Sequence, residues 1–346
     1  MIGNGTTETA LVTGGGGFLG TAIVRLLVDR GIRVRSFARN RYPHLDALGV
    51  EQIQGDLAEE RSAHRACSGV DVVFHTAAKA GVWGPYGAFY RANSLGTFRI
   101  IEACQESGVP RLVFTSSPSV VFDGTDKAGV DESVPYPQRY TTHYQATKAA
   151  AEKAVLAAAS SKLAVVVLRP HLIWGPGDPH LTPRILQRAE SLRIVGDGTN
   201  RVDTVYVDNA ARAHLLAADR LAETREISGR CYFISQDDPI PLWEMINRIL
   251  EAGGKAPVQK CVSFPAAWLA GAVLELVYGI FRLPGEPRMT RFVASELARD
   301  HWFDISAARR DLGYEPAVST EEGLNRLKSW LSTPESGAAS GGSGSA

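Results

Sequence analysis

The sequence lacks net charge and lacks any cysteine pattern. Its 346 residues include 37 Lys and Arg against 37 Asp and Glu, so the formal net charge is zero. A chain without net charge creates no overall field that attracts nucleic acid, an anionic membrane or an acidic substrate. The four cysteines are isolated and form no C-x-x-C pair, which argues against a disulfide framework or a zinc site. We therefore expect no nucleic-acid partner and no metal.

A long hydrophobic run and a secretory signal are also missing. The most apolar stretch, Ala266–Phe281, is interrupted only by Glu275, and its 16 residues fall short of the roughly 20 that span a bilayer. Large aliphatic residues recur there at helical spacing, at Leu269, Val273, Leu276 and Ile280. We expect an amphipathic helix packed against the core, with insertion into a membrane interface as the alternative. The protein is expected to be soluble and cytoplasmic, without an integral membrane span.

Between two polar ends, predicted strands alternate with predicted helices. The strands are Thr9–Thr13, Ile32–Arg39, Val50–Gln54, Asp71–Thr76, Arg111–Ser116 and Leu163–Arg169, and the main helices are Phe18–Arg30, Phe89–Ser107 and Tyr140–Ala158. This alternation predicts an α/β fold with a doubly wound parallel Rossmann sheet. Beyond Trp174 the alternation weakens, which predicts a smaller C-terminal substrate-binding lobe.

The predicted domain boundaries follow from these patterns. Residues 9–180 form the Rossmann domain and residues 181–335 form the lobe, with 202–235 returning to the Rossmann domain. Residues 1–8 are a flexible N-terminus. Residues 336–346 contain only Ser, Gly and Ala and are a flexible tail or linker.

A glycine-rich loop follows the first predicted strand. Thr13–Gly20 reads TGGGGFLG, with Gly14, Gly17 and Gly20 at the positions of a dinucleotide-binding loop. The first glycine makes the turn, the second admits a pyrophosphate, and the third lets the helix pack closely on the sheet. We assign Gly14, Gly17, Phe18, Leu19 and Gly20 to cofactor binding.

The end of the second predicted strand favours NADP over NAD. NAD-binding folds usually place an acid there to hold the ribose 2′-hydroxyl. This sequence instead reads SFARNR, so that Arg39 and Arg41 could hold a 2′-phosphate. We expect NADPH or NADP as the cofactor. Asp56, after the third strand, is placed either to accept from the adenine amino group or to cap a helix.

Tyr144 and Lys148 are four residues apart in a predicted helix and therefore share a face. Tyrosine, with an ordinary pKa of about 10, is a poor acid–base group at neutral pH. A neighbouring ammonium and an oxidised nicotinamide would both favour the phenolate and lower that pKa. Ser117 follows a predicted strand at the sheet edge where ligands collect. We predict Ser117, Tyr144 and Lys148 as the catalytic set, although Ser117 could also be a turn serine that bonds to the backbone.

These motifs make the chain similar to the extended short-chain dehydrogenase/reductase family, in the branch with 3β-hydroxysteroid dehydrogenases and nucleotide-sugar epimerases. The resemblance runs from Leu11 to about Tyr314 and includes GDL at Gly55–Leu57, HTAA at His75–Ala78, YQATK at Tyr144–Lys148 and LRPHLIWGPGD at Leu168–Asp178. It implies catalytic roles for Ser117, Tyr144 and Lys148. It further implies that Leu57, Ala77, Ala78, Tyr144, Lys148 and Pro170 contact the cofactor.

Three further segments narrow the resemblance. Thr115–Gly124, His171–His180 and Gly285–Phe292 resemble the 2-alkyl-3-oxoalkanoate reductases of long-chain olefin biosynthesis. This implies an NADPH-dependent reductase that transfers hydride to the 3-keto group of a 2-alkyl-3-oxoalkanoate, and reversibly a 3-hydroxy acid dehydrogenase. The alternatives are a 3β-hydroxysteroid or sterol-4-carboxylate 3-dehydrogenase and, second, a nucleotide-sugar epimerase. A sugar dehydratase is excluded, because Ser116 and Ser117 stand where that chemistry needs an Asp-Glu pair.

The substrate side is predicted from aromatic and cationic residues near the site. Trp83, Phe122 and Trp174 suggest an apolar pocket for a hydrophobic β-keto or β-hydroxy acid. Lys79 and Arg184 are candidates to bind the carboxylate of such a substrate. The resemblance also implies an assembly with thiolase-, β-lactone synthetase- and β-lactone decarboxylase-type enzymes of olefin biosynthesis. We expect a homo-oligomer.

Overall fold

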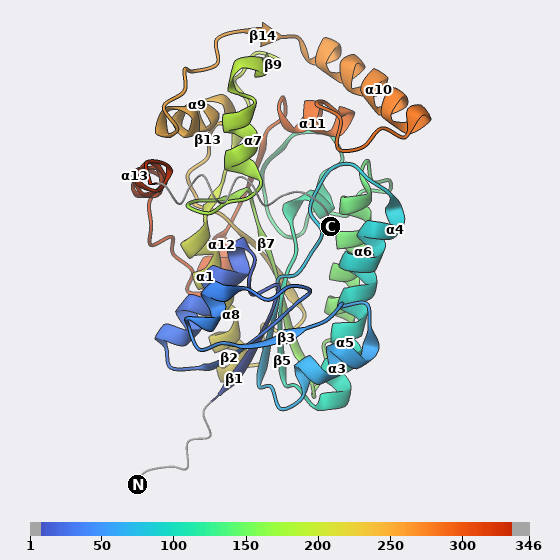
Figure 1. Ribbon diagram of the computed structural model, residues 1–346, viewed down its shortest axis with the longest axis vertical. Coiled ribbons are helices and arrows are strands. Elements are labelled where there is room, and N and C mark those ends of the chain that lie inside the picture. The colour runs from blue at the N-terminus through green and yellow to red at the C-terminus, as the bar shows by residue number, and fades with distance from the viewer. Residues whose placement is uncertain (1–7, 334–346) are drawn as a thin grey trace.

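A seven-stranded parallel sheet forms the centre of the molecule in the computed structural model, which describes residues 8–333 (Figure 1). Its strand order is β3-β2-β1-β4-β5-β7-β12, so the winding direction reverses between β1 and β4. The strands are β1 (Thr9–Thr13), β2 (Arg33–Ala38), β3 (Glu51–Gln54), β4 (Val72–His75), β5 (Arg111–Thr115), β7 (Ala164–Pro170) and β12 (Arg230–Ile234). The predicted α/β fold with a doubly wound parallel sheet is confirmed.

Helices cover both faces of this sheet because its strands are apolar on both sides. Along β1, Ala10 and Val12 point into one core and Leu11 points into the other. The first face carries α1 (Phe18–Asp29), α8 (Val207–Glu223) and α12 (Ser306–Leu312), and the second carries α3 (Glu60–Cys67), α5 (Gly96–Ser107) and α6 (His143–Ala157). The carboxyl ends of the strands point toward the upper part of Figure 1.

The upper part of Figure 1 is a smaller lobe with its own hydrophobic core. Its helices are α7 (Leu181–Gln187), α9 (Leu242–Ala252), α10 (Phe264–Phe281), α11 (Arg291–Glu296) and α13 (Thr320–Leu331). Short strands support them: β6 (Lys127–Val130), β8 (Ile173–Trp174), β9 (Ile194–Val195), β10 (Arg201–Val202), β11 (Val205–Tyr206), β13 (Ile240–Pro241), β14 (Cys261–Val262) and β15 (His301–Phe303). Between the lobe segments the chain returns to the sheet, where α8 packs against α1 and β12 pairs with β7.

Two predicted helices differ from the observed ones. The helix predicted over Tyr140–Ala158 begins at His143, because Thr142 and Gln145 form a reciprocal capping box. The region predicted as one helix, Phe89–Ser107, divides into α4 (Tyr86–Phe89), a π-helical segment (Tyr90–Leu95) and α5. A short helix α2 (Pro43–Asp46) was not predicted. The predicted flexible ends lie outside the described residues, except for Glu8, which pairs with Arg111.

The expected packing of Ala266–Phe281 against the core is wrong. This segment is α10, in which only Ala267 and Gly271 are buried. The predicted apolar face points outward, and its four aliphatic side chains are between 52% and 65% exposed: Leu269, Val273, Leu276 and Ile280. The large aliphatic residues were expected to face the protein, whereas in the structure the small residues Ala267 and Gly271 do. Within residues 8–333, α10 is the one helix that is long and apolar enough to cross a membrane, which by itself is weak evidence of a span.

Candidate active site

The glycine loop forms a narrow turn between β1 and α1. Gly14 has φ +69°, and a Cβ there would lie 3.0 Å from the Ala77 backbone. A Cβ on Gly20 would lie 2.1 Å from the Gly14 carbonyl oxygen. Gly17 is the N-cap of α1 and has no side chain to occupy the N–H groups of the first turn, which includes Phe18 and Leu19. This cradle is shaped for the pyrophosphate of a dinucleotide, since those free N–H groups favour a bound anion.

Two residues beside the loop were missed by the sequence reasoning. A Cβ on Gly15 would meet Ser36 Oγ at 2.5 Å, and one on Gly16 would overlap the Tyr42 ring. Ser36 lies in β2 and is the first residue of the SFARNR stretch, which contains no acid. Its hydroxyl is therefore part of the loop wall, a role that the composition of the segment does not reveal.

The two arginines after β2 differ in their surroundings. Arg41 is engaged by Asp46, whose carboxylate accepts from Nε at 3.1 Å and from Nη2 at 2.8 Å. Arg39 is exposed, and no described carboxylate forms an ion pair with it; its charge acts on Asp56 from a distance. Arg39 is thus the more available cation for a phosphate, and Arg41 would have to leave Asp46 first.

Asp56 lies at the end of β3 and does not cap a helix, because α3 begins at Glu60 with Glu59 as its N-cap. One carboxylate oxygen accepts from the Ala58 N–H at 2.9 Å, and the other accepts from Arg91 at 2.9 Å. Burial would raise the pKa of Asp56, but these hydrogen bonds hold it below its ordinary value. The helix-cap alternative is therefore excluded, while the adenine contact stays a prediction. The adjacent Leu57 packs against Gly96.

Ser117, Tyr144 and Lys148 come together beyond the end of β5. Ser117 directly follows Ser116 and accepts a hydrogen bond from the Ser119 N–H at 3.2 Å. Its hydroxyl also hydrogen-bonds to Tyr144. Because Ser117 Oγ already accepts from Ser119, its own proton is free to donate toward the tyrosine oxygen. Ser117 thus contacts Tyr144, and Lys148 reaches the end of the same strand through the Thr115 carbonyl, so all three residues lie beyond β5.

Lys148 lies one helical turn after Tyr144 and is only 2% exposed. Its Nζ donates to the Thr115 carbonyl at 2.7 Å and lies 4.2 Å from the centroid of the Phe114 ring. Burial lowers the pKa of Lys148 to about 7, against a smaller opposing effect of Glu152. Glu152 raises that pKa only weakly because its carboxylate is bound by Arg169, with Nη2 to Oε1 at 2.5 Å.

Burial raises the pKa of Tyr144, and the Ser117 hydrogen bond offsets this only in part. The lowering expected from sequence depends also on an oxidised nicotinamide, so that expectation stays a prediction. In the protein alone Tyr144 is therefore a proton donor, which suits the reduction of a carbonyl better than the reverse reaction.

Asn93 connects the catalytic helix to the loop after β4. Its side chain accepts from the Lys79 N–H at 2.7 Å and donates to the Lys79 carbonyl at 3.1 Å and to Thr147 Oγ1 at 3.2 Å. The same loop contains Ala77, which bonds to Thr13 at the start of the glycine loop, and the exposed Ala78. Pro170 is buried where β7 ends. The predicted cofactor residues thus line one edge of the sheet.

The predicted substrate residues do not all lie at one surface. Phe122 is buried behind the trio, where its carbonyl accepts from Gln145 at 2.9 Å. Trp83 is half-buried and contacts Tyr278 of α10, with ring centroids 6.4 Å apart. Trp174 is fully buried in the lobe core and donates to Thr204 at 2.9 Å. Trp174 is therefore a core side chain here, and its expected contact with substrate gains no support.

The two candidate cations also differ. Arg184 already forms an ion pair with Glu286. Lys79 lies 5.6 Å from the Phe89 ring centroid and has no carboxylate partner among the described residues. A half-buried ammonium without a counter-ion is the better candidate to bind a substrate carboxylate, because no existing pair must be broken.

A buried histidine pair behind Phe122 was not predicted. His171 Nδ1 lies 2.5 Å from Asp203 Oδ1, His171 Nε2 lies 3.1 Å from His301 Nδ1, and His301 Nε2 lies 2.8 Å from the Glu296 carbonyl. Burial lowers the pKa of His301. His301 contacts the Phe122 ring, and the cluster fixes that wall of the site.

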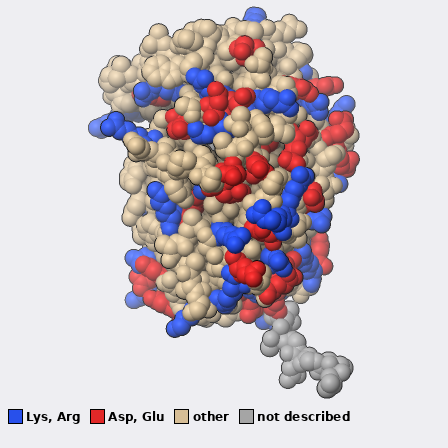
Figure 2. All heavy atoms as spheres, turned by 180° about the vertical axis from the view of Figure 1, so that it is seen from behind, with Lys and Arg blue, Asp and Glu red and all other residues tan. Residues whose placement is uncertain are grey.

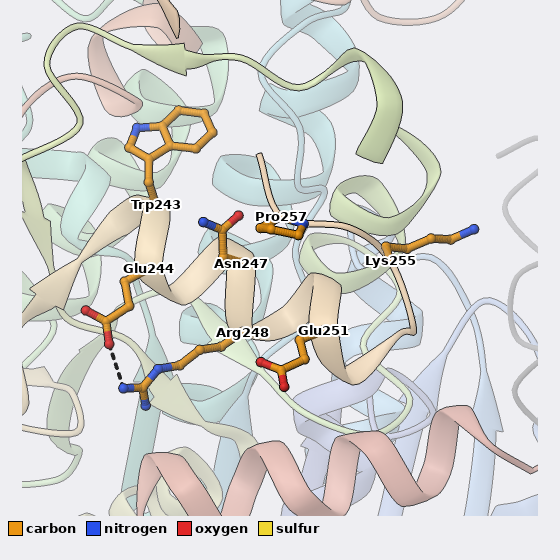
Figure 3. Close-up of a pocket in the computed structure, with 7 residues that line it drawn as sticks. All are labelled: Trp243, Glu244, Asn247, Arg248, Glu251, Lys255 and Pro257. Carbon is orange, nitrogen blue, oxygen red and sulfur yellow. Dashed lines mark hydrogen bonds and ion pairs between the residues drawn. The ribbon is translucent and has the colours of Figure 1, made fainter. Parts of the chain in front are cut away.

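A surface hollow on α9 is separate from the trio (Figure 3). It is lined by Trp243, Glu244, Asn247, Arg248, Glu251, Lys255 and Pro257. Glu244 and Arg248 pair across one helical turn at 2.6 Å. No predicted catalytic or cofactor residue lines this hollow. Within residues 8–333, no group of three or more His, Cys, Asp or Glu side chains is placed to hold a metal ion.

Comparison with known proteins identifies relatives of this chain. The profile of the 3-beta hydroxysteroid dehydrogenase/isomerase family matches residues 11–266. The chain belongs to this family. It is 51% identical over 323 residues to the 2-alkyl-3-oxoalkanoate reductase of Stenotrophomonas maltophilia, covering 92% of this chain and 98% of that protein.

More distant members and neighbours agree. The chain is 33% identical to the sterol-4-alpha-carboxylate 3-dehydrogenase, decarboxylating, of Mus musculus, over 91% of this chain and 88% of that one. Among solved structures, MoeE5 in complex with UDP-glucuronic acid and NAD is 28% identical, with a TM-score of 0.72 over 93% of this chain and 98% of that chain. This member of the 3-beta hydroxysteroid dehydrogenase/isomerase family is an NAD(P)-dependent oxidoreductase, and its glycine cradle fits a nicotinamide nucleotide.

Two buried histidines hydrogen-bond to residues at the carboxyl ends of β1 and β5, and they predict that the folded protein loses stability in acid. His75 bonds to Thr13 and Thr97, and His214 bonds to Thr115 and to the Ala210 carbonyl. Burial lowers the pKa of His75 to about 3 and that of His214 to about 4. The unfolded chain takes up these protons below pH ~6.5 and the folded chain does not, so stability falls as the pH falls from ~6.5 toward 4.

The expected slope is about 1.4 kcal/mol per pH unit for each histidine, measured as the free energy of unfolding by urea. His75→Gln and His214→Gln should each flatten the slope. His180→Gln, at an exposed position, should leave it unchanged. A slope that is the same in all four proteins would contradict the assignment.

Proposed function

We propose that the protein is an NADPH-dependent reductase of the 3-keto group of a 2-alkyl-3-oxoalkanoate, and reversibly a 3-hydroxy acid dehydrogenase. The observation that carries the proposal is the placement of Ser117, Tyr144 and Lys148 beyond the carboxyl end of β5, in the same sheet whose β1 leads into the glycine cradle. The 51% identity to a 2-alkyl-3-oxoalkanoate reductase supports the choice of substrate class. As the sequence resemblance implies, the reaction would be a step of long-chain olefin biosynthesis.

The three side chains take different roles in this reaction. When bound, a nicotinamide nucleotide supplies the hydride that reduces a carbonyl carbon. Ser117 donates a hydrogen bond that orients the carbonyl oxygen, and Tyr144 gives its phenolic proton to that oxygen as it becomes the hydroxyl. Lys148 stabilises the resulting phenolate and holds the nicotinamide ribose. The raised pKa of Tyr144 keeps it protonated for reduction, so oxidation should be faster at alkaline pH.

The preference for NADPH rests on the segment after β2. No acid occupies that segment, and Arg39 is free to bind a 2′-phosphate, whereas Arg41 is held by Asp46. Replacing Arg39 by Ala should raise the KM for NADPH about 10- to 100-fold, because a charge-assisted bond is lost. The KM for NADH should change little.

Two matched variants calibrate this cofactor test. Arg41→Ala should raise the KM for NADPH by only about threefold, because Asp46 already holds the Arg41 guanidinium through two hydrogen bonds. Arg61→Ala removes an exposed arginine of α3 and should have no effect. If Arg39→Ala raises both KM values equally, NADP specificity does not come from this residue.

The proposed substrate has an apolar body and a carboxylate next to the reacting carbon. Lys79 is the cation that we assign to the carboxylate, because it follows Ala77 and Ala78 at the cofactor edge and has no described acidic partner. Trp83, which is half-buried, is the aromatic candidate to contact the apolar body, whereas Phe122 is buried. Arg184, neutralised by Glu286, is the second choice.

The substrate class is tested by the oxidation direction, since β-keto acids decarboxylate readily. Purified protein is offered 2-alkyl-3-hydroxy acids and 4-carboxysterols with NADP or NAD. We expect turnover of the alkyl hydroxy acids with NADP. Turnover of the 4-carboxysterols alone would favour the sterol-4-carboxylate dehydrogenase alternative, which the 33% identical mouse relative supports. NAD that stays bound through purification, with no release on turnover, would favour an epimerase.

A further inference from the structure

The outer surface of α10 is made of large aliphatic side chains. At 100° per residue, Leu269, Val273, Leu276 and Ile280 fall within about 60° of one another on the helix. They are 62%, 52%, 62% and 65% exposed, and at the C-terminal end of the helix Phe281 and Leu283 are 69% and 41% exposed. We call these six residues the α10 face. Soluble proteins rarely leave a contiguous apolar surface of this kind uncovered.

The opposite side of α10 is built to lie close to the protein. A Cβ on Gly271 would lie 2.6 Å from the backbone carbon of Thr290, so the helix touches the start of α11 backbone to backbone. Glu275 accepts from the Arg291 N–H and Nε, each at 2.7 Å. Small and hydrogen-bonded residues therefore face inward and the large apolar ones face outward. This orientation is the reverse of that in a helix whose outer face meets water.

The charges around the α10 face are predominantly basic. The segment 253–291 contains five cations, Lys255, Lys260, Arg282, Arg288 and Arg291, and two acids, Glu275 and Glu286. Both acids are neutralised, by Arg291 and by Arg184. Lys260 and Arg282, which flank α10, are exposed and have no described acidic partner. Figure 2 shows mostly uncharged surface at the end of the molecule that carries the lobe.

The inner side of α10 contacts the loop that follows β4. Tyr278 of α10 contacts Trp83, which belongs to the loop that carries Ala77, Ala78 and Lys79. In Figure 1, α10 lies at the top of the molecule, above α11 and on the side of α4 and α6. A bilayer that contacts the α10 face would therefore be separated from this loop by about the thickness of one helix.

We propose that α10 docks the protein, peripherally and reversibly, onto a lipid bilayer that carries anionic headgroups. The aliphatic residues of the α10 face enter the interface, and Lys260 and Arg282 bind the headgroups. The link to substrate delivery depends on the function proposed above, whereas the docking itself does not. Docking would bring the loop that carries Lys79 close to the lipid, in which long alkyl chains dissolve.

The composition of the face favours lipid over a protein partner. Protein interfaces concentrate their binding energy in Trp, Tyr and Arg, with Leu and Val under-represented. The α10 face consists of Leu, Val, Ile and Phe, and the exposed Trp268 of the same helix is also typical of helices that lie in a membrane interface. A second copy of the chain would also bring like charges at Arg282 and Lys260 into one contact region. Anionic lipid complements both the apolar face and its basic flanks.

The test is sedimentation of the full chain with vesicles of phosphatidylglycerol and phosphatidylcholine, and with phosphatidylcholine alone. The wild type should pellet with the anionic vesicles and be released by high salt. The variants L276S/I280S and K260Q/R282Q should each bind about tenfold more weakly. The pair R61Q/K162Q, which removes the same charge from exposed positions on other elements, should bind like the wild type.

Binding is measured without substrate, so its outcome is independent of the reductase assignment. L276S/I280S should keep its thermal midpoint and its turnover of a short-chain hydroxy acid, because both side chains are exposed. Wild-type protein that stays in the supernatant with all vesicles overturns the proposal. So does equal pelleting of L276S/I280S, release only by detergent, or a wild-type dimer that L276S/I280S dissociates without any vesicle binding.

Discussion

Replacing Tyr144 by Phe should lower kcat by about 10²- to 10⁴-fold while leaving the Kd for the nicotinamide nucleotide within a few fold. The substitution removes only the hydroxyl that hydrogen-bonds to Ser117 and gives its proton to the substrate oxygen. The ring and its packing in α6 stay in place. The measurement is steady-state turnover, with cofactor binding followed separately by nucleotide fluorescence.

A second tyrosine provides a matched control for the loss of a hydroxyl. Tyr232 of β12 donates to Asp311 at 3.1 Å, away from the trio. Tyr232→Phe should lower stability by about 1 kcal/mol and leave kcat unchanged. If Tyr144→Phe turned over at nearly the wild-type rate with normal cofactor binding, the proposed proton donor would be the wrong residue.

Gly20→Ala should weaken nucleotide binding by more than about 100-fold. The added Cβ would lie 2.1 Å from the Gly14 carbonyl oxygen, and since real Cβ atoms do not approach so closely, the glycine loop or the first turn of α1 must move. A shift of about 1 Å in groups that position a ligand is costly, because several hydrogen bonds are lost together. Isothermal titration with NADPH measures this effect.

Gly279→Ala is the matched control for a helical glycine. A Cβ at Gly279 of α10 would meet nothing within 4 Å, so the change adds a methyl group to open space. It should stabilise the protein by up to about 1 kcal/mol through helix propensity and leave nucleotide binding unaltered. Nucleotide affinity that survives in Gly20→Ala would contradict the cradle described for Gly14–Gly20.

The sheet and the catalytic trio were predictable from sequence because their signals are local. Strands such as Thr9–Thr13 are uninterrupted apolar runs, and Gly14, Gly17 and Gly20 mark the turn that follows. Tyr144 and Lys148 share a helix face through spacing alone. Each of these patterns depends on residues that are close in the chain, so tertiary packing had little opportunity to override it.

The predictions that failed depend on what packs against a segment. Periodicity located the apolar stripe of α10 but could not say which side faces the protein, and Gly271 rather than the leucines makes that contact. Trp174 looked like a pocket residue and is fully buried in the lobe core. The His171–Asp203–His301 cluster joins residues up to 130 positions apart in the chain, so no local sequence motif predicts it.

The place of β12 at the edge of the sheet has a consequence during synthesis on the ribosome. All seven residues of β7 are buried, and one edge of this strand is covered only by β12, which begins 60 residues after β7 ends at Pro170. At about 5–20 residues per second, the ribosome needs roughly 3–12 seconds to make the missing strand. During that interval the nascent chain presents an apolar strand edge that can pair with other chains. The strand order therefore creates an interval during synthesis in which the nascent chain depends on chaperones to protect the edge of β7.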